Sequence, residues 1–196
     1  MRSSTSLRVF VAIEIPPREL ARIGDLAGHL KSFGARIAWV PAANVHVTLA
    51  FLGDIECDRV GSVTAAVTAA CDTFRPFELS IHGTGSFPAS SRAKVLWAGV
   101  DGDVDTLRAL QGRVAGALRS EGFTLDDKPF RPHLTIGRVK DGRGPELAAV
   151  LRELGSATLT GKPFVVDSVT VIRSELLPSG ARYSPLARIG LGGKAP

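Results

Sequence analysis

A short pattern of histidine, apolar residue, threonine and apolar residue occurs twice in this chain. The copies are His46-Val47-Thr48-Leu49 and His133-Leu134-Thr135-Ile136, separated by a little under half of the 196 residues. Each copy lies in an apolar run typical of a β-strand, in which side chains two positions apart point to the same face. Each copy therefore presents one imidazole and one hydroxyl on a single surface, and the fold must accommodate two such surfaces.

The rest of the chain shows alternating strand and helix patterns. Apolar residues have helical spacing at 18–33, 58–73, 104–119 and 146–154, and strand-like runs occur at 7–15, 36–40, 77–87, 94–100, 163–175 and 182–189. Strands near the two motifs alternate apolar with polar residues, which favours antiparallel sheets with one packed and one open face. No linker or break in composition divides the chain. We therefore expect an α+β fold of two pseudosymmetric lobes within one domain spanning residues 1–196.

Charge and composition limit the function classes. The net charge is +5 and the sequence pI about 9.7, which favours a polyanionic partner such as RNA, although arginine-rich compositions also have other origins. No apolar run reaches the roughly 20 residues that span a membrane, so no membrane partner is expected. The start of the chain, Met1 to Arg8, leads into a run that contains Glu14 and lacks a signal-peptide pattern. We therefore predict a cytoplasmic protein.

No cofactor is indicated by the sequence. The chain has only two cysteines, Cys57 and Cys71, and four histidines, and none of these residues has a spacing typical of a metal site. It also has no glycine-rich loop of the Walker type. We therefore expect no metal and no cofactor.

The two histidines of the motifs suit metal-free hydrolysis of a phosphodiester. Such a reaction needs one group that deprotonates water and one that protonates the leaving oxygen. Imidazole serves both roles because its ordinary pKa of about 6.5 lets either form exist near neutrality. The alternative is that His46 and His133 are half-buried strand residues without chemistry. Two occurrences of the same motif among four histidines favour the catalytic interpretation.

Charge that develops on the phosphate oxygens must also be stabilised. The hydroxyls of Thr48 and Thr135 can donate hydrogen bonds to nonbridging oxygens, although threonine is also simply a good strand residue. The cation nearest to a motif is Arg138, five residues after His133. Arg131, two residues before His133, is the second candidate. For either arginine, the alternative is a solvated surface charge.

With these residues in place, the chain resembles the two-histidine (2H) phosphoesterase superfamily. The closest branch is the bacterial and archaeal RNA 2′,3′-cyclic phosphodiesterases, also called LigT-like 2′-5′ RNA ligases. The resemblance covers most of the chain and includes both motifs in full. Further matching segments are Arg8 to Pro16, Trp39-Val40, His46 to Gly53, Trp97, and Phe130 to Arg138.

The resemblance implies a fold, a reaction and a set of residue roles. Each lobe would be an antiparallel sheet with outer helices, and both motifs would face a central cleft. The enzyme would hydrolyse an RNA 2′,3′-cyclic phosphate end and leave a 2′-phosphomonoester. By this resemblance His46 is the proton donor and His133 the proton acceptor; the two motifs are nearly equivalent in sequence, so the residues alone leave this assignment open.

The resemblance further implies that Arg138 binds the phosphate and that Phe51 stacks on the terminal base. Each of these residues lies five positions after a motif histidine, which on an ideal strand is the opposite face. A bulge, a strong twist or a strand end must therefore re-aim both side chains toward the cleft.

Related activities remain open alternatives. A sister enzyme with the same site would act on 2′-5′ oligonucleotides or other cyclic phosphates, or would join RNA ends by the reverse of cleavage. A protein of another class would be an RNA-end binding module with vestigial catalysis. We expect RNA with a 2′,3′-cyclic phosphate end as the partner, and a monomeric enzyme.

Metal-free catalysis can be tested directly. We expect hydrolysis of an oligonucleotide bearing a 2′,3′-cyclic phosphate to continue in EDTA at an unchanged rate, because two imidazoles supply the proton transfers. A rate that falls in EDTA and returns with a divalent cation would contradict this expectation.

Overall fold

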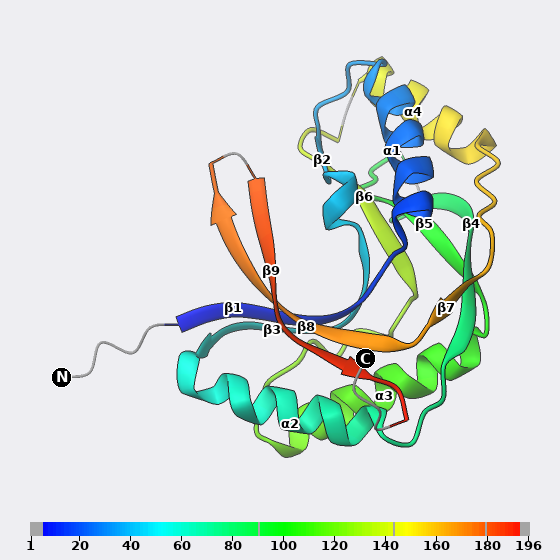
Figure 1. The fold of residues 1–196 in the computed structure, drawn as a ribbon. Coiled ribbons are helices and arrows are strands. Elements are labelled where there is room, and N and C mark those ends of the chain that lie inside the picture. The colour runs from blue at the N-terminus through cyan, green and yellow to red at the C-terminus, as the bar shows by residue number, and fades with distance from the viewer. Residues whose placement is uncertain (1–5, 90, 143, 179, 193–196) are drawn as a thin grey trace.

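The two motif strands lie at the centre of a strongly curved antiparallel sheet (Figure 1). The structure, a computed structural model, describes residues 6–89, 91–142, 144–178 and 180–192. In it, β3 (His46–Glu56) carries the first motif and β6 (His133–Val139) carries the second. The two strands pair directly, with Val47 opposite Leu134. The expected α+β class with antiparallel strands is confirmed.

The described elements alternate along the chain. The helices are α1 (Pro17–Lys31), α2 (Val60–Cys71), α3 (Val104–Ser120) and α4 (Pro145–Ser156), with short 3-10 turns η1 (Ala42–Asn44) and η2 (Cys57–Arg59). The other strands are β1 (Ser6–Glu14), β2 (Ile37–Trp39), β4 (Phe77–Phe87), β5 (Val95–Gly102), β7 (Phe164–Val166), β8 (Ser168–Leu177) and β9 (Gly180–Gly190).

The order of the strands shows the pseudosymmetry that the repeated motif predicts. The sheet runs β7-β4-β5-β6-β3-β1-β8-β9, with β2 paired to β6 beside this path. Outward from the central β6–β3 pair, β5 on one side matches β1 on the other, and β4 matches β8. Strand β4 comes from the first half of the chain but lies in the lobe of β5 and β6, and β8 comes from the second half but lies in the lobe of β1 and β3. Each half of the chain therefore contributes an outer strand to the lobe of the other half.

The helices cross between the lobes in the same way. Helix α3 follows β5 but packs on α2 and β3, in the lobe of the first motif. Helix α1 follows β1 but packs on β6 and α4, in the lobe of the second motif. In Figure 1, α2 and α3 lie together along one side of the sheet, and α1 and α4 lie together at the other end. The two lobes therefore interlock, and neither lobe is a continuous segment of the chain.

Local sequence signals explain where the main elements begin and end. The β-branched run of β1 stops at Pro16, and Pro17 provides the first residue of α1, where its missing N–H costs nothing. Helix α3 begins after Asp103, whose carboxylate accepts a hydrogen bond of 3.1 Å from the Thr106 amide. Its buried stripe, with the spacing expected for an amphipathic helix, is Leu107, Leu110, Val114, Ala115 and Leu118.

One predicted strand is wrong in its extent. The run 163–175 was expected to form a single strand, but the chain forms two, β7 and β8, separated at Asp167. The residues on the two sides pair with different lobes: β7 pairs with β4, while β8 pairs with β1 and β9. A strand-like run has no signal for such a change of partner, because local hydrophobicity does not specify which strands pair with each other.

Two further sequence expectations concern the chain ends and the membrane. The first five residues, which bear on the predicted absence of a signal peptide, lie outside the described residues. Within the described part of the chain, no helix is both long enough and apolar enough to cross a membrane.

The junction of the lobes provides a stability prediction. Leu134 is fully buried at the one pair that joins β3 to β6, so Leu134→Ala leaves a cavity there. We expect a loss of about 2–5 kcal/mol in the free energy of unfolding, measured by chemical denaturation. The control is Val165→Ala, on β7 with 56% of its surface exposed, which should change stability by no more than about 0.5 kcal/mol. Equal losses for the two variants would contradict the prediction.

Candidate active site

Both motif histidines are held by the same hydrogen bond. The Nδ1 of His46 lies 2.8 Å from the carbonyl oxygen of Asn44, and the Nδ1 of His133 lies 2.7 Å from the carbonyl oxygen of Arg131. A carbonyl oxygen only accepts, so Nδ1 must carry the proton in both rings. The Nε2 atoms are therefore the nitrogens that remain to give or take a proton. In each case the partner is two residues upstream, so the duplication extends to the hydrogen bond that holds the histidine ring.

The two rings differ in what surrounds them. Phe10 of β1 stacks on His46, with ring centroids 4.7 Å apart and planes 26° apart, and Tyr183 of β9 contacts the same ring by its edge at 5.5 Å. Only one aromatic ring of the described residues contacts His133, the edge of Phe87 at 5.1 Å. His46 is thus enclosed by the β1–β9 side of the cleft, whereas His133 lies in a more open setting.

This enclosure affects the protonation of His46. Burial lowers the pKa of His46, and the nearby positive charges of His133 and Arg138 lower it further, while the hydrogen bond to Asn44 opposes the shift. In the ligand-free protein the neutral form of His46 is therefore favoured near pH 6.5. An anion bound between the motifs would oppose the two positive charges and raise this pKa.

A β-bulge in each motif strand places the residue five positions after the histidine on the cleft side. In β3, Ala12 pairs with Thr48 and Val11 with Ala50, so Leu49 is the extra residue. In β6, Trp97 pairs with Thr135 and Leu96 with Gly137, so Ile136 is the extra residue. Two successive residues are buried at each bulge, after which Phe51 and Arg138 are exposed again. The required re-aiming of both residues is confirmed.

The carbonyl oxygen of each extra residue accepts a hydrogen bond from a group that belongs to neither of the strand pairs β1–β3 and β5–β6. The side chain of Gln111 on α3 donates to the Leu49 oxygen at 3.2 Å. The backbone amide of Val40 donates to the Ile136 oxygen at 3.0 Å. These bonds satisfy buried acceptors and hold the bulges in place. A side chain at Gly137 would also collide with β2, since a Cβ there would lie 2.8 Å from the Cγ2 of Ile37.

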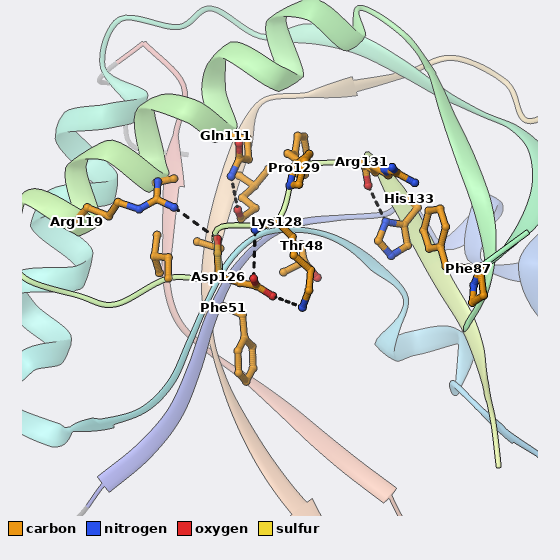
Figure 2. Close-up of a pocket in the computed structure, with 16 residues that line it drawn as sticks. Thr48, Phe51, Phe87, Gln111, Arg119, Asp126, Lys128, Pro129, Arg131 and His133 are labelled. Carbon is orange, nitrogen blue, oxygen red and sulfur yellow. Dashed lines mark hydrogen bonds and ion pairs between the residues drawn. The ribbon is translucent and has the colours of Figure 1, made fainter. Parts of the chain in front are cut away.

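The site residues surround two hollows that meet at β3. One, of about 470 Å³, is lined by His46, Thr48, Phe51, Thr135 and Arg138, with Arg8, Phe10 and Tyr183 among its other walls. The other, of about 500 Å³, is lined by Thr48, Phe51 and His133, with Arg131 and Phe87 (Figure 2). Thr48 and Phe51 border both, so the two hollows adjoin; together they make up the cleft, which suits a ligand of nucleotide size.

The structure separates the two candidate cations. Arg138 lies in the hollow of His46, together with both threonines. Arg131 precedes β6 and lies on the His133 side, where its guanidinium is 5.8 Å from the Phe87 ring centroid and its carbonyl supports His133. Arg138 is thus the arginine placed beside both motif hydroxyls.

Several residues of the cleft were missed by sequence reasoning. Phe10, Phe87, Tyr183 and Gln111 lie far from the motifs in the chain and have no motif of their own. Arg8, noted only within a matching segment, has its guanidinium 4.7 Å from the ring centroid of Phe51. Its position two residues before Phe10 on β1 is the signal that places both on the cleft face.

The structure was also searched for metal ligands. Within the described residues, no three side chains of histidine, cysteine, aspartate or glutamate lie together in a group that could hold a metal ion.

With this geometry established, comparison with known proteins identifies the family. The family model of the 2′-5′ RNA ligase superfamily matches residues 12–176. The chain belongs to the 2′-5′ RNA ligase superfamily. The matched segment contains both histidines, both threonines, and Phe51, Arg131 and Arg138. The resemblance noted from the motifs is therefore confirmed.

Individual members of the superfamily match over nearly the whole chain. A protein of Methanothermobacter thermautotrophicus named RNA 2′,3′-cyclic phosphodiesterase is 31% identical over 92% of this chain and 96% of its own length. A crystal structure of a Thermus thermophilus protein is similar with a TM-score of 0.76 and 25% identity, covering 96% of this chain and all of that one. The structure of E. coli LigT with 3′-AMP has the same fold, with a TM-score of 0.75 and 23% identity, over 95% of this chain and 99% of that chain.

The effect of Arg138 on His46 can be measured by histidine NMR titration. We expect His46 to titrate below 6.5, and the Arg138→Gln variant to raise its pKa because a repelling charge is removed. Arg173→Gln is the control, since Arg173 already pairs with Glu175 at 3.0 Å and does not line the cleft. A His46 pKa that stays unchanged or falls in Arg138→Gln would contradict the expectation.

Proposed function

We propose that this protein hydrolyses RNA 2′,3′-cyclic phosphate ends to 2′-phosphomonoesters. The observation that carries the proposal is the pair of imidazoles that face one cleft with matching supports. Both Nδ1 atoms donate to carbonyl oxygens, so both Nε2 atoms are available for proton transfer. The relatives named RNA 2′,3′-cyclic phosphodiesterase support the choice of substrate.

The reaction needs the cyclic phosphate to lie between the two motifs. A water molecule attacks phosphorus on one side, and the 3′-oxygen leaves on the opposite side, so that the 2′-oxygen keeps the phosphate. We assign His133 as the base that accepts the proton of the water and His46 as the acid that protonates the 3′-oxygen. This is the assignment that the resemblance to the family implies.

The surroundings of His46 are compatible with an acid only when substrate is bound. Burial and two nearby positive charges lower the pKa of His46 in the free protein. The anionic phosphodiester would offset the charge of Arg138 and so favour the protonated ring. Substrate binding would thus prepare the proton donor, and the free enzyme would hold His46 mainly neutral.

The remaining cleft residues are assigned to binding. The hydroxyls of Thr48 and Thr135 donate to the nonbridging oxygens, and the guanidinium of Arg138 balances the charge that develops on them. Phe51, 44% exposed at the meeting point of the two hollows, offers a ring on which the terminal base can stack. Arg131 is assigned to substrate contact on the His133 side. No metal or cofactor takes part in this scheme.

We further propose that one copy of the chain suffices. What supports this is that both imidazoles, both hydroxyls and Arg138 come from the same chain and line the two adjoining hollows of the cleft. The interlocking of the lobes likewise supports a single domain over residues 1–196. The cytoplasmic location stays a prediction.

The function is tested with variants of each histidine. We expect His46→Ala and His133→Ala each to lower kcat on an oligonucleotide with a 2′,3′-cyclic phosphate end by about 10²- to 10⁴-fold, because each removes a proton-transfer group. His29→Ala is the control, since this histidine is exposed on α1 and contacts Glu153 outside the cleft. Circular dichroism checks that all three variants keep the fold.

The product decides the direction of cleavage. Phosphorus NMR should show a 2′-phosphomonoester as the only product of the wild-type protein. A 3′-phosphomonoester would mean that the 2′-oxygen had left in place of the 3′-oxygen, which would contradict the scheme. Tight binding of the substrate without turnover would instead favour a binding module.

A further inference from the structure

We infer that Arg8, Ser174 and Tyr183 form a second phosphate subsite, which binds the phosphodiester on the 5′ side of the terminal nucleotide. This inference rests on the proposed function, because it assigns a further part of the same RNA substrate. The three residues belong to β1, β8 and β9, outside both motifs. All three line the hollow that contains His46 and Arg138.

The sheet register places the three side chains in one row. Arg8 pairs with Ser174, and Ser174 pairs with Tyr183, so the residues are direct neighbours across three adjacent strands. Side chains of directly opposed residues lie on the same face of a sheet. The row therefore presents a guanidinium and two hydroxyls side by side, and these are donors that phosphate groups accept. In Figure 1 the β8–β9 hairpin lies beside β1, at one edge of the sheet.

The charge of Arg8 lacks an ion-pair partner. On the same hairpin, Arg173 and Arg182 both pair with Glu175 at 3.0 Å. Arg8, in contrast, forms no ion pair with any described residue, although Asp54 stands opposite it on β3. Its one described contact is the face of the Phe51 ring. A cleft-facing arginine without an acidic partner is available to an anionic ligand.

Arg138, on β6, is in the same state. It too lines the cleft and forms no ion pair with a described residue. The charges of both arginines act on Tyr183: burial raises the pKa of its hydroxyl, and Arg138 and Arg8 each oppose this rise. Tyr183 therefore lies within the field of two separate cations. The hollow offers two positive centres, so it suits a ligand with two phosphates better than one with a single phosphate.

An RNA end supplies two phosphates in the required order. The cyclic phosphate takes the position between the motifs, near Arg138, and the next phosphate along the chain is the 5′-phosphodiester of the same nucleotide. The base stacked on Phe51 brings this nucleotide beside Arg8, whose guanidinium already contacts that ring at 4.7 Å. The second subsite would make the enzyme prefer an RNA end over a free nucleoside cyclic phosphate.

Two small substrates separate the subsite from the reacting centre. One is adenosine 2′,3′-cyclic phosphate, and the other is the same compound with a 5′-methyl phosphodiester. We expect the wild-type protein to have a kcat/KM about 10- to 100-fold higher for the second, as for a hydrogen bond between charged groups. In Arg8→Gln this ratio should fall toward one. The ratio cancels any loss that is common to both substrates.

Further variants keep the test decisive. Arg8→Lys retains a point charge and should keep part of the ratio, and Tyr183→Phe should lower it by a few-fold through loss of one neutral donor. The matched control is Arg173→Gln, next to Ser174 on β8 but absent from the cleft lining, which should keep the full ratio. A ratio near one in the wild-type protein, or an undiminished ratio in Arg8→Gln, would overturn the subsite.

Failure of the subsite is distinguishable from failure of the proposed function. If the wild-type protein hydrolyses neither small substrate nor the oligonucleotide with a 2′,3′-cyclic phosphate end, the proposed function fails. The subsite is then decided by calorimetric binding of adenosine 2′-phosphate with and without the 5′-methyl phosphodiester. A binding preference for the compound with the 5′-methyl phosphodiester that is lost in Arg8→Gln supports the subsite, and equal affinities reject it.

Discussion

The pairing of β3 with β6 at Val47 and Leu134 is the contact on which the site depends. It joins the two lobes along the pseudosymmetry axis, and both residues are fully buried. Because the strands are antiparallel, the histidine of each motif lies near the threonine of the other. The two imidazoles and two hydroxyls thus gather about one point, where the proposed function requires a single phosphate to be contacted from both sides.

The duplication extends beyond the four residues that define the motif. Each histidine donates from Nδ1 to a carbonyl two residues upstream, and each strand contains a bulge at the third residue after the histidine. The symmetry ends at the sixth position, where one copy has Phe51 and the other has Arg138. One lobe therefore presents an aromatic ring and the other a guanidinium, and under the proposed function these would be a base side and a phosphate side.

The surroundings of the histidines break the symmetry further. His46 is enclosed by Phe10 and Tyr183, whereas His133 contacts the edge of Phe87. Burial is the largest cause of the lowered pKa of His46. The two motifs are therefore equivalent in sequence but unequal in surroundings, as the proposed assignment of opposite proton transfers requires.

The sequence by itself determined the two motifs, the antiparallel α+β class and most helix and strand positions, because these follow from local spacing of apolar residues and from residue chemistry. It also showed that a bulge, a strong twist or a strand end had to re-aim Phe51 and Arg138, and the structure has bulges. Only the tertiary structure decided which strands adjoin the motifs, since the exchange of β4 and β8 between lobes depends on long-range pairing. The split at Asp167, the enclosure of His46 and the row of Arg8, Ser174 and Tyr183 all follow from that pairing, and a local pattern has no means to encode it.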